Sequence, residues 1–314
     1  MDTYIVRLKP LSPYLTPWRT CTLWGRLCWV IADQRLPGWD IERWLAFYKE
    51  GMMPPLVVGD AFPADALPVP DIFRALPKER IAHSLPNGME SPHKTLPWDD
   101  WKSLCETARF PQEKPIPEGE YANTERAKNG KVRRAERTHV VMDRGLGRAV
   151  DGGLRSEQGH QPEELLFVAQ LDNALGEDGL ETLVRELCLE GWGQGRTYGY
   201  GHVELIGIER IEIPQPTGWA VTLGHCHPTD DLPMDGFWRW TGVPVRPHDP
   251  ATRKAPDQHF TTMLLHFTTM LLPGACFATD KSFIGRNIPL DGRSDYLHYG
   301  LAPTWPACVR SDKD

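Results

Sequence analysis

Five glycines within residues 191–201 restrict the fold of this chain more than any other stretch does. Before them, residues 177–190 carry apolar side chains at helical spacing, and Gly191 is a natural helix stop. After them, residues 202–213 are rich in β-branched residues. The sequence therefore predicts a helix, a glycine loop and a strand. The buried helical stripe is expected to be Leu180, Leu183, Val184 and Leu187.

This order excludes two common nucleotide-binding motifs. A dinucleotide-binding turn needs a strand before a helix, with glycines at G-x-G-x-x-G spacing, and a Walker loop needs Gly-Lys-Ser/Thr. Glycine-rich backbone can instead form an anion-binding concavity, to which Arg196 adds a planar cation. Tyr198 and Tyr200 offer flat faces for bases. A loose turn remains an alternative, although five glycines are more than a turn requires.

The helix–loop–strand arrangement resembles the RAMP superfamily of CRISPR-associated proteins. Its members have a ferredoxin-like fold, similar to RNA-recognition domains, with a glycine-rich loop between the last helix and the last strand. Other blocks, in their order along the chain, resemble one branch: the Csm-type fourth subunit, in the Cas5-like group, of type III effector complexes. These blocks are residues 4–17, 22–32, 58–63, 68–70 and 138–144, with a weaker echo at 297–302.

The resemblance implies an α+β fold in two parts. A ferredoxin-like (RRM-like) RAMP domain would cover residues 1–213, with an inserted thumb hairpin at about 118–160. A smaller β-rich or ferredoxin-like domain would cover residues 214–314. Asn129-Gly130 is a typical hairpin turn within the thumb.

The resemblance also implies a function in antiviral defence. The chain would be a non-catalytic crRNA-binding subunit that grips the 5′ tag of the guide and contacts target RNA near the tag. It would bridge the large signature subunit and the backbone RAMP subunits. No cofactor is expected. The expected RNA-binding residues are Gly193, Gly195, Arg196, Thr197, Tyr198, Gly199, Tyr200, Gly201, Arg19, Arg133, Arg134, Arg137, His139, Arg144 and Arg148.

The way charge is distributed along the chain supports RNA binding better than the net charge of the whole chain does. The net charge of −7 argues against a free-standing nucleic-acid binder. Residues 121–160, however, carry nine Lys and Arg against five Asp and Glu, and residues 161–190 carry one against eight. Such neighbouring segments suit a protein that contacts RNA with one face and protein with another. A solvated basic loop is the alternative for the first segment.

Two other functions remain open. Some RAMP proteins cleave precursor crRNA with a histidine as general acid or base, and His139 is the best candidate here. A hydrogen-bonded structural or RNA-contacting histidine is the favoured interpretation of His139. The third possibility is a purely structural subunit that bridges its neighbours and whose glycine loop has no role in RNA binding. That reading predicts unchanged RNA affinity and salt dependence in Arg196→Ala and Tyr198→Ala.

The cysteines indicate a cytoplasmic protein. There are seven, an odd number, with no C-x-x-C pair, no signal peptide and no apolar run of transmembrane length. His225-Cys226-His227 resembles a metal-binding cluster. Adjacent strand residues point to opposite sides and no second ligand pair lies nearby, so no metal site is expected.

Local patterns predict further elements. Residues 3–9 alternate as a strand, with Tyr4, Val6 and Leu8 on one side. A helix follows, started by Thr16 or Thr20, with Trp24 and Trp29 in the core. Further helices are expected at 40–50 and 98–108, and strands at 56–60, 164–171, 219–223, 237–245 and 276–278. The predicted role of Asp60 is a turn or cap, or a functional acid of the family.

A seven-residue segment is repeated in tandem. Residues 259–265 and 266–272 are both His-Phe-Thr-Thr-Met-Leu-Leu. A strand has a side-chain period of two, so a shift of seven residues would put the two copies on opposite faces. We expect the second copy to be the strand, followed by a hairpin turn at Pro273-Gly274.

Overall fold

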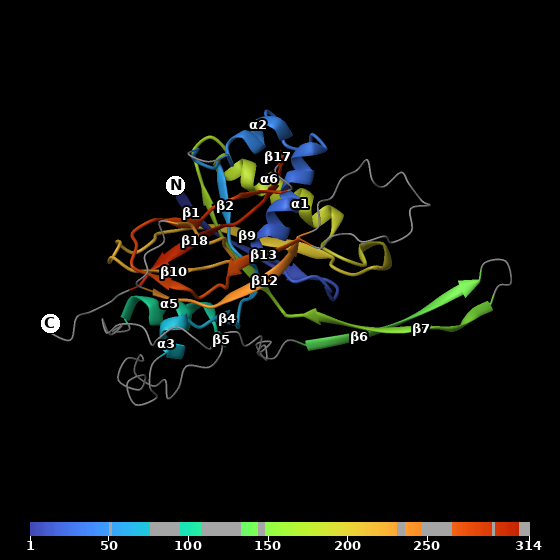
Figure 1. Cartoon of the computed structure of the whole chain (residues 1–314). Helices are drawn as coiled ribbons and strands as arrows, with labels where there is room; N and C mark the ends of the chain where they lie inside the picture. The colour runs from blue at the N-terminus through green and yellow to red at the C-terminus, as the bar shows by residue number, and fades with distance from the viewer. Residues whose placement is uncertain are drawn as a thin grey trace.

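The computed structural model describes residues 1–49, 52–75, 95–107, 133–143, 148–230, 236–245, 266–290 and 293–307. The chain has an α+β fold in which the strands pair antiparallel and helices are few. Two five-stranded sheets form the body, and smaller two-stranded ribbons surround them (Figure 1). This confirms the predicted α+β class.

The first sheet has the strand order β2-β8-β1-β9, and β3 also pairs with β8. Its central strand, β1 (Asp2–Pro10), lies between β8 (Leu165–Leu171) and β9 (Val203–Ile211). β2 (Leu56–Val58) and β3 (Phe62–Pro63) complete it. Alternation along β1 places Tyr4, Val6 and Leu8 in one hydrophobic core and Ile5 in another, as predicted.

Helices α1 (Thr20–Ala32) and α6 (Gly176–Glu190) pack on the first sheet and on each other (Figure 1). The predicted buried stripe of α6 is confirmed. On α1, Trp24 is buried as predicted, but the core position predicted for Trp29 is wrong, because its side chain is 38% exposed. Neither Thr16 nor Thr20 caps α1. The cap residue is Arg19, without a side-chain bond, and the Thr20 amide donates to Asp60 instead.

The second sheet packs against the other face of the first. Its order is β11-β14-β10-β18-β15. Residues of both sheets share one core with the tryptophans of α5 (Trp98–Thr107). The strands are β10 (Ala220–Thr222), β11 (Gly236–Phe237), β14 (Cys276–Phe277), β15 (Phe283–Gly285) and β18 (Leu301–Pro306).

The remaining described elements are short, apart from one hairpin. Helix α2 (Ile41–Ala46) is shorter than the predicted 40–50, with Asp40 as its N-cap. The others are α3 (Asp71–Ala75), β4 (Leu67–Pro68), β5 (Thr95–Leu96), β12 (Trp240–Val245), β13 (His266–Leu271), β16 (Ile288–Leu290) and β17 (Arg293–His298). No helix in the described ranges is long and apolar enough to cross a bilayer.

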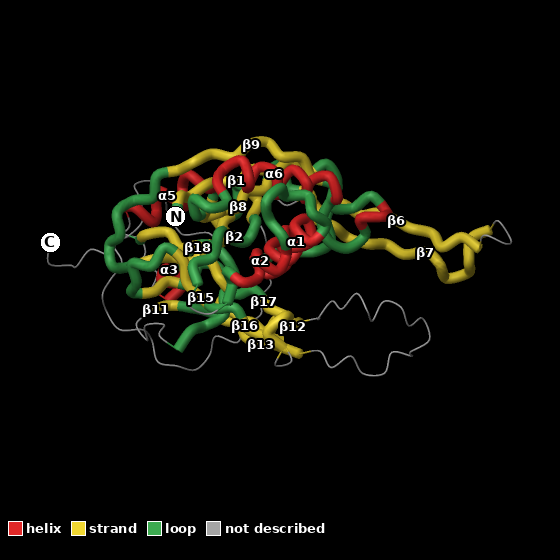
Figure 2. The backbone as a smooth tube through the Cα atoms, turned by 90° about the horizontal axis from the view of Figure 1, so that it is seen from above, coloured by secondary structure: helices red, strands yellow, loops and turns green. Residues whose placement is uncertain are grey.

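The long hairpin is formed by β6 (Arg133–Asp143) and β7 (Arg148–Gln161). It projects away from the body in both views (Figures 1 and 2). Asp143 is paired with Arg148 at one end of the hairpin. The turn predicted at Asn129-Gly130 lies outside the described residues.

The second copy of the tandem repeat forms β13, as predicted, and the first copy lies outside the described residues. The hairpin predicted after it is wrong. β13 pairs with β12, whereas β14 pairs with β10 and β11. Gly274 has a φ of 93° and lies where an added Cβ would meet the Val69 carbonyl oxygen at 3.0 Å. The chain therefore crosses between sheets at this turn.

Residues beyond position 213 contribute to the core under the helices. The Tyr299 ring stacks on Trp24 with centroids 5.0 Å apart, and its hydroxyl accepts a 3.1 Å hydrogen bond from the Val58 amide. Leu301 belongs to the same core. The division predicted at 213/214 stays a prediction, and the two parts are packed together over a shared interior.

A pair of contacting histidines, of which His227 is buried and His298 partly buried, joins three segments of this C-terminal part. His227 Nε2 lies 2.7 Å from His298 Nδ1, and His227 Nδ1 lies 2.9 Å from the Thr269 carbonyl oxygen. Burial lowers the pKa of His227 below its ordinary value. Burial and the neighbouring His227 together lower the pKa of His298 to about 4. The fold therefore favours the neutral form of both rings.

This pair is expected to make the fold sensitive to acid. A histidine whose folded pKa is depressed binds its proton more readily when unfolded, so stability is lost as the pH falls from about 6.5 towards 4. Urea unfolding at pH 7 and pH 4.5 should show that wild type loses roughly 1–3 kcal/mol more than His298→Gln does. The exposed His202, changed to Gln, is the control and should behave as wild type. Equal losses in all three proteins would contradict the expectation.

Candidate nucleic-acid interface

The glycine loop (residues 191–201) begins where α6 ends. All five of its glycines have positive φ, between 68° and 84°, in the region that other residues rarely occupy. A short 3₁₀ turn, η1 (Arg196–Tyr198), lies between Gly195 and Gly199, both left-handed. Gly191 caps α6, as predicted. The glycines therefore set the path of the backbone at each reversal.

The loop closes on itself at Gly201. The Trp192 amide donates a 2.7 Å hydrogen bond to the Gly201 carbonyl oxygen. A Cβ added at Gly201 would overlap the Trp192 backbone, whose carbonyl oxygen is the nearest atom. Both the close approach and the φ of 68° require glycine at this position.

Residues 11–18, which we call the docking segment, hold the loop in place. The Gln194 amide donates to Thr16 Oγ1 at 2.9 Å, and the Gly201 amide donates to the Pro13 carbonyl oxygen at 2.8 Å. The Trp192 indole stacks on Trp18 with centroids 3.8 Å apart and planes 7° from parallel. The loop is therefore an anchored element, and the loose-turn interpretation does not describe it.

The docking segment also holds the base of the long hairpin. Tyr14 and His160 exchange two backbone hydrogen bonds, each 2.9 Å long. Gly159 lies where an added Cβ would meet Pro13 Cβ at 2.8 Å. Arg19 follows the segment at the start of α1 and is partly exposed. The structure thus brings together three regions that the sequence predicted as RNA contacts: the loop, the hairpin base and Arg19.

The two tyrosines of the loop have opposite environments. The Tyr198 side chain is 73% exposed, and Thr197 beside it is also exposed. Tyr200 is completely buried, and its ring occupies the space next to Gly195, where an added Cβ would meet Tyr200 Cδ2 at 2.8 Å. The base-stacking role predicted for Tyr200 therefore does not fit its buried position, whereas the Tyr198 ring is exposed.

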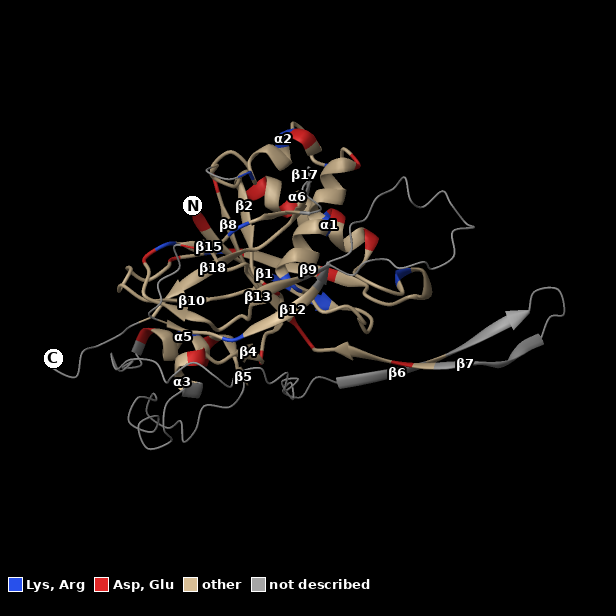
Figure 3. Cartoon of the chain, in the orientation of Figure 1, with Lys and Arg blue, Asp and Glu red and all other residues tan. Residues whose placement is uncertain are grey.

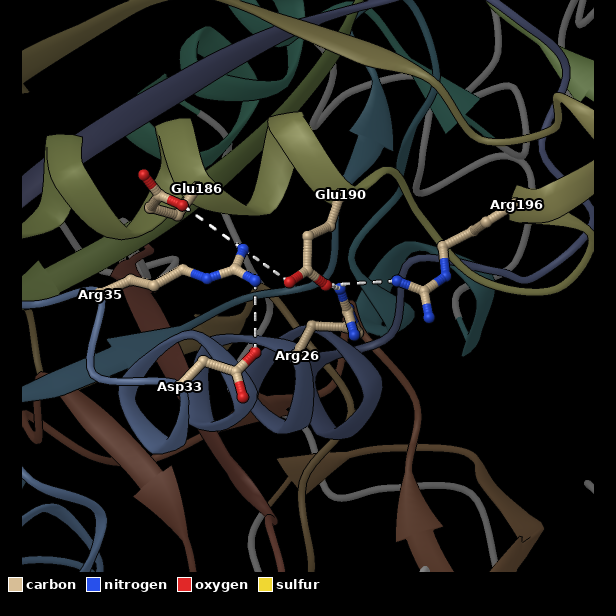
Figure 4. A network of polar contacts seen from close by, with 6 residues as sticks. All are labelled: Arg26, Asp33, Arg35, Glu186, Glu190 and Arg196. Atoms are coloured by element: carbon tan, nitrogen blue, oxygen red, sulfur yellow. Dashed lines mark hydrogen bonds and ion pairs between the residues drawn. The ribbon is translucent and has the colours of Figure 1, made fainter.

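Arg196 extends from the loop toward the end of α6 (Figure 4). Its Nη1 lies 3.3 Å from Glu190 Oε2. Glu190 also forms ion pairs with Arg26 of α1 and, at 2.6 Å, with Arg35. Partial burial alone would raise the pKa of Glu190, but hydrogen bonding to Arg26 and the charges of the three arginines outweigh it and lower the pKa. Glu190 is therefore an anion throughout the neutral range.

The basic residues predicted for the thumb lie on the hairpin. Arg133, Arg134, Arg137 and His139 belong to β6, and Arg148 begins β7. In the register, His139 is opposite Arg155. Arg144 lies outside the described residues. The acidic counterpart, residues 161–190, includes α6, on whose ribbon Asp and Glu are coloured red in Figure 3.

A buried Asp60–His225 pair supports the start of α1. Asp60 Oδ1 accepts hydrogen bonds from the amides of Thr20, at 2.8 Å, and His225, at 3.1 Å, and Oδ2 lies 2.6 Å from His225 Nδ1. This arrangement agrees with the predicted capping role of Asp60. The pairing with His225 was not predicted, because 165 residues separate them.

His225 and His227 contact different partners, Asp60 and His298 respectively. Strand-like alternation around Cys226 explains this, as the sequence predicted. Within the described part of the chain, no group of three His, Cys, Asp or Glu side chains is arranged to hold a metal ion.

Comparison with known proteins gives a match at the level of structure. No family model and no curated protein sequence matches the chain. A chain of a Csm1–Csm4 cassette crystallised with AMPPNP aligns over 99% of both chains, with 17% identity and a TM-score of 0.54. A chain of such a cassette with pppApApA aligns over 99% of both chains, with 16% identity and a TM-score of 0.53.

These two matches cover the whole chain at low sequence identity, so they establish its fold. The chain shares the fold of a chain of the Csm1–Csm4 cassettes. The resemblance predicted from the sequence blocks is confirmed in this respect.

Proposed function

We propose that this chain, which has a Csm4-like RAMP fold, is a non-catalytic RNA-binding subunit of a type III CRISPR effector complex. It would hold the 5′ tag of the crRNA at the glycine loop. The observation that carries the proposal is the anchored loop, which presents Arg196, Thr197 and Tyr198 beside the hairpin base. The shared fold supports membership of such a complex.

The topology of the first sheet supports the ferredoxin-like part of the proposal. The chain runs β1, α1, β2, β8, α6, β9, and these strands lie in the order β2-β8-β1-β9, all antiparallel. This is the β-α-β-β-α-β sequence of a ferredoxin-like unit. The glycine loop then lies between its last helix and last strand.

The chemistry of the loop suits single-stranded RNA. Arg196, in the 3₁₀ turn, provides a planar donor for phosphate oxygens. The exposed ring of Tyr198 offers a stacking surface worth roughly 1–3 kcal/mol per base. Unpaired, splayed nucleotides are the form of RNA that such surfaces recognise. A short 5′ tag is a ligand of this kind.

We further propose that the hairpin contacts target RNA near the tag and that the body bridges the large signature subunit to the backbone subunits. The matched chains come from cassettes of Csm1 with Csm4, which supports a large-subunit partner.

Purification of this chain with and without its neighbouring subunits, followed by sequencing of bound RNA, tests the assignment. Crosslinks from a shared 5′ tag to residues 193–201 are the expected result. No RNA in either preparation would contradict it.

Arg196→Gln is expected to weaken RNA binding and reduce its salt dependence. If Arg196 neutralises one phosphate, its loss should reduce the slope of log K against log salt by about 0.7. Fluorescence anisotropy with a labelled octauridylate at several salt concentrations measures both quantities. Arg185→Gln removes the same charge from the exposed face of α6 and should leave the slope unchanged. Among the described residues, Arg185 pairs only with Glu181. Equal slopes in all three proteins would favour a purely structural subunit.

The non-catalytic assignment has a separate test. Incubation of the chain with repeat-containing precursor RNA should give no cleavage. Cleavage that disappears in His139→Ala, while RNA binding is retained, would instead establish the endoribonuclease alternative.

A further inference from the structure

The carboxylate of Glu190 occupies an unusual position for a residue next to an anion-binding loop. It is the last residue of α6, directly before Gly191, and three guanidinium groups surround it (Figure 4). Arg26 and Arg196 share the same oxygen, Oε2, and Arg35 contacts Oε1. A carboxylate that receives several guanidinium donors resembles a phosphate in geometry and charge.

The three arginines differ in the exposure of their side chains and in the number of ion pairs they form. Arg26 is only 16% exposed, and its ion pair with Glu190 joins α1 to α6. Arg35 pairs with Glu190 at 2.6 Å and also with Glu186 and Asp33, each at 3.4 Å. Arg196 is 38% exposed and has the longest of the three contacts with Glu190. Among the residues that the structure describes, Glu190 is its one ion-pair partner.

We propose that Glu190 is an internal counter-ion that restrains Arg196, and that RNA phosphate binds the loop by displacing Glu190 from Arg196. This inference rests on the proposed function and specifies how its site works. The exchange leaves no buried charge unpaired, because Arg26 and Arg35 stay on Glu190 when Arg196 leaves. Glu190 thus acts as a positioning residue. It lowers the affinity of the loop for phosphate and holds Arg196 where the loop leaves α6.

The proposal predicts a gain of affinity on removal of the competing carboxylate. Glu190→Gln should bind octauridylate about two- to fivefold more tightly than wild type, since an ion pair of this exposure is weak but must be broken before phosphate binds. Glu186→Gln is the matched control. It removes a charge from the same helix and from the same Arg35, yet Glu186 forms no ion pair with Arg196. Its affinity should equal that of wild type.

A double-mutant cycle identifies Arg196 as the residue that is released. In the Arg196→Gln background, Glu190→Gln should give no further gain, so the two substitutions should be strongly non-additive. An equal gain in both backgrounds would overturn the proposal, because it would indicate a general charge effect. Weaker binding by Glu190→Gln would overturn it as well, since the carboxylate would then be required for binding.

Loss of the carboxylate leaves Arg26 with an uncompensated, largely buried charge, which would lower stability. The variant Arg26→Met/Glu190→Gln removes both members of that pair while still releasing Arg196, and it should show the same gain. Failure of the proposed function looks different: neither Arg196→Gln nor Glu190→Gln would change RNA affinity. Failure of the exchange alone would leave Arg196→Gln weaker than wild type and Glu190→Gln without a gain.

Discussion

Gly201→Ala is expected to destabilise the protein by roughly 2–5 kcal/mol and to abolish RNA binding by the loop. Two penalties combine. A left-handed φ costs an alanine about 1–2 kcal/mol, and overlap with a fixed neighbour typically costs about 1–3 kcal/mol more. The neighbour here is the Trp192 backbone, which cannot move away without breaking the bond that closes the loop. Urea unfolding measures the loss of stability, and anisotropy with octauridylate measures binding.

Two other glycines separate these penalties. Gly38 has a φ of 80°, and no atom lies within 4 Å of an added Cβ, so Gly38→Ala should show only the conformational penalty of about 1–2 kcal/mol. Gly207 has no positive φ and is equally open, so Gly207→Ala should be close to wild type. If Gly201→Ala were no less stable than Gly38→Ala, the backbone overlap inferred for the loop would be incorrect.

Asp60→Ala is expected to cost at least about 3 kcal/mol of stability. The substitution leaves three buried donors without their acceptor: the amides of Thr20 and His225 and the His225 ring nitrogen. Each buried donor left unsatisfied costs about 1–3 kcal/mol. Because Thr20 begins α1, Arg19 and the docking segment should also lose order, and RNA affinity should fall with stability. Urea unfolding and anisotropy measure both effects.

Asp40 provides the matched control. It is also a helix-capping aspartate, but it is exposed and accepts a single bond, from the Arg43 amide at 2.8 Å. Asp40→Ala should cost about 1 kcal/mol, the usual value for an N-cap. In a double-mutant cycle, Asp60→Ala and His225→Ala should be coupled by about 0.5–3 kcal/mol. Additive losses would show that the two side chains do not act as a pair.

Features that depend on neighbouring residues could be predicted from the sequence. The buried stripe of α6 follows from helical periodicity, and the glycine stop follows from the backbone freedom of Gly191. The alternation of β1 follows from the two-residue period of a strand. The second copy of the repeat was predicted as a strand because the turn after it is marked by proline and glycine.

Features that depend on distant residues could not be predicted. Tyr200 is buried because glycines at 191, 195 and 201 fold the loop back on itself, and composition does not reveal that path. Asp60 finds His225 only when the ends of β2 and β10 meet. Trp29 has the hydrophobicity of a core residue, but its place on α1 faces outward. The crossover after β13 arises because β13 pairs with β12 while β14 pairs with β10, and these pairings join residues that are distant in sequence.

The position of β1 at the centre of the first sheet has a consequence for synthesis of the protein. Its first residues pair with Leu171 on one side and Ile211 on the other. The ribosome makes β1 long before β8 (Leu165–Leu171), and longer still before β9 (Val203–Ile211). The docking segment likewise lacks its hydrogen-bond partners until His160 and Gly201 have been made. Because contacts between residues so distant in sequence form slowly, the nascent chain should need protection from aggregation until residue 211 is free of the ribosome.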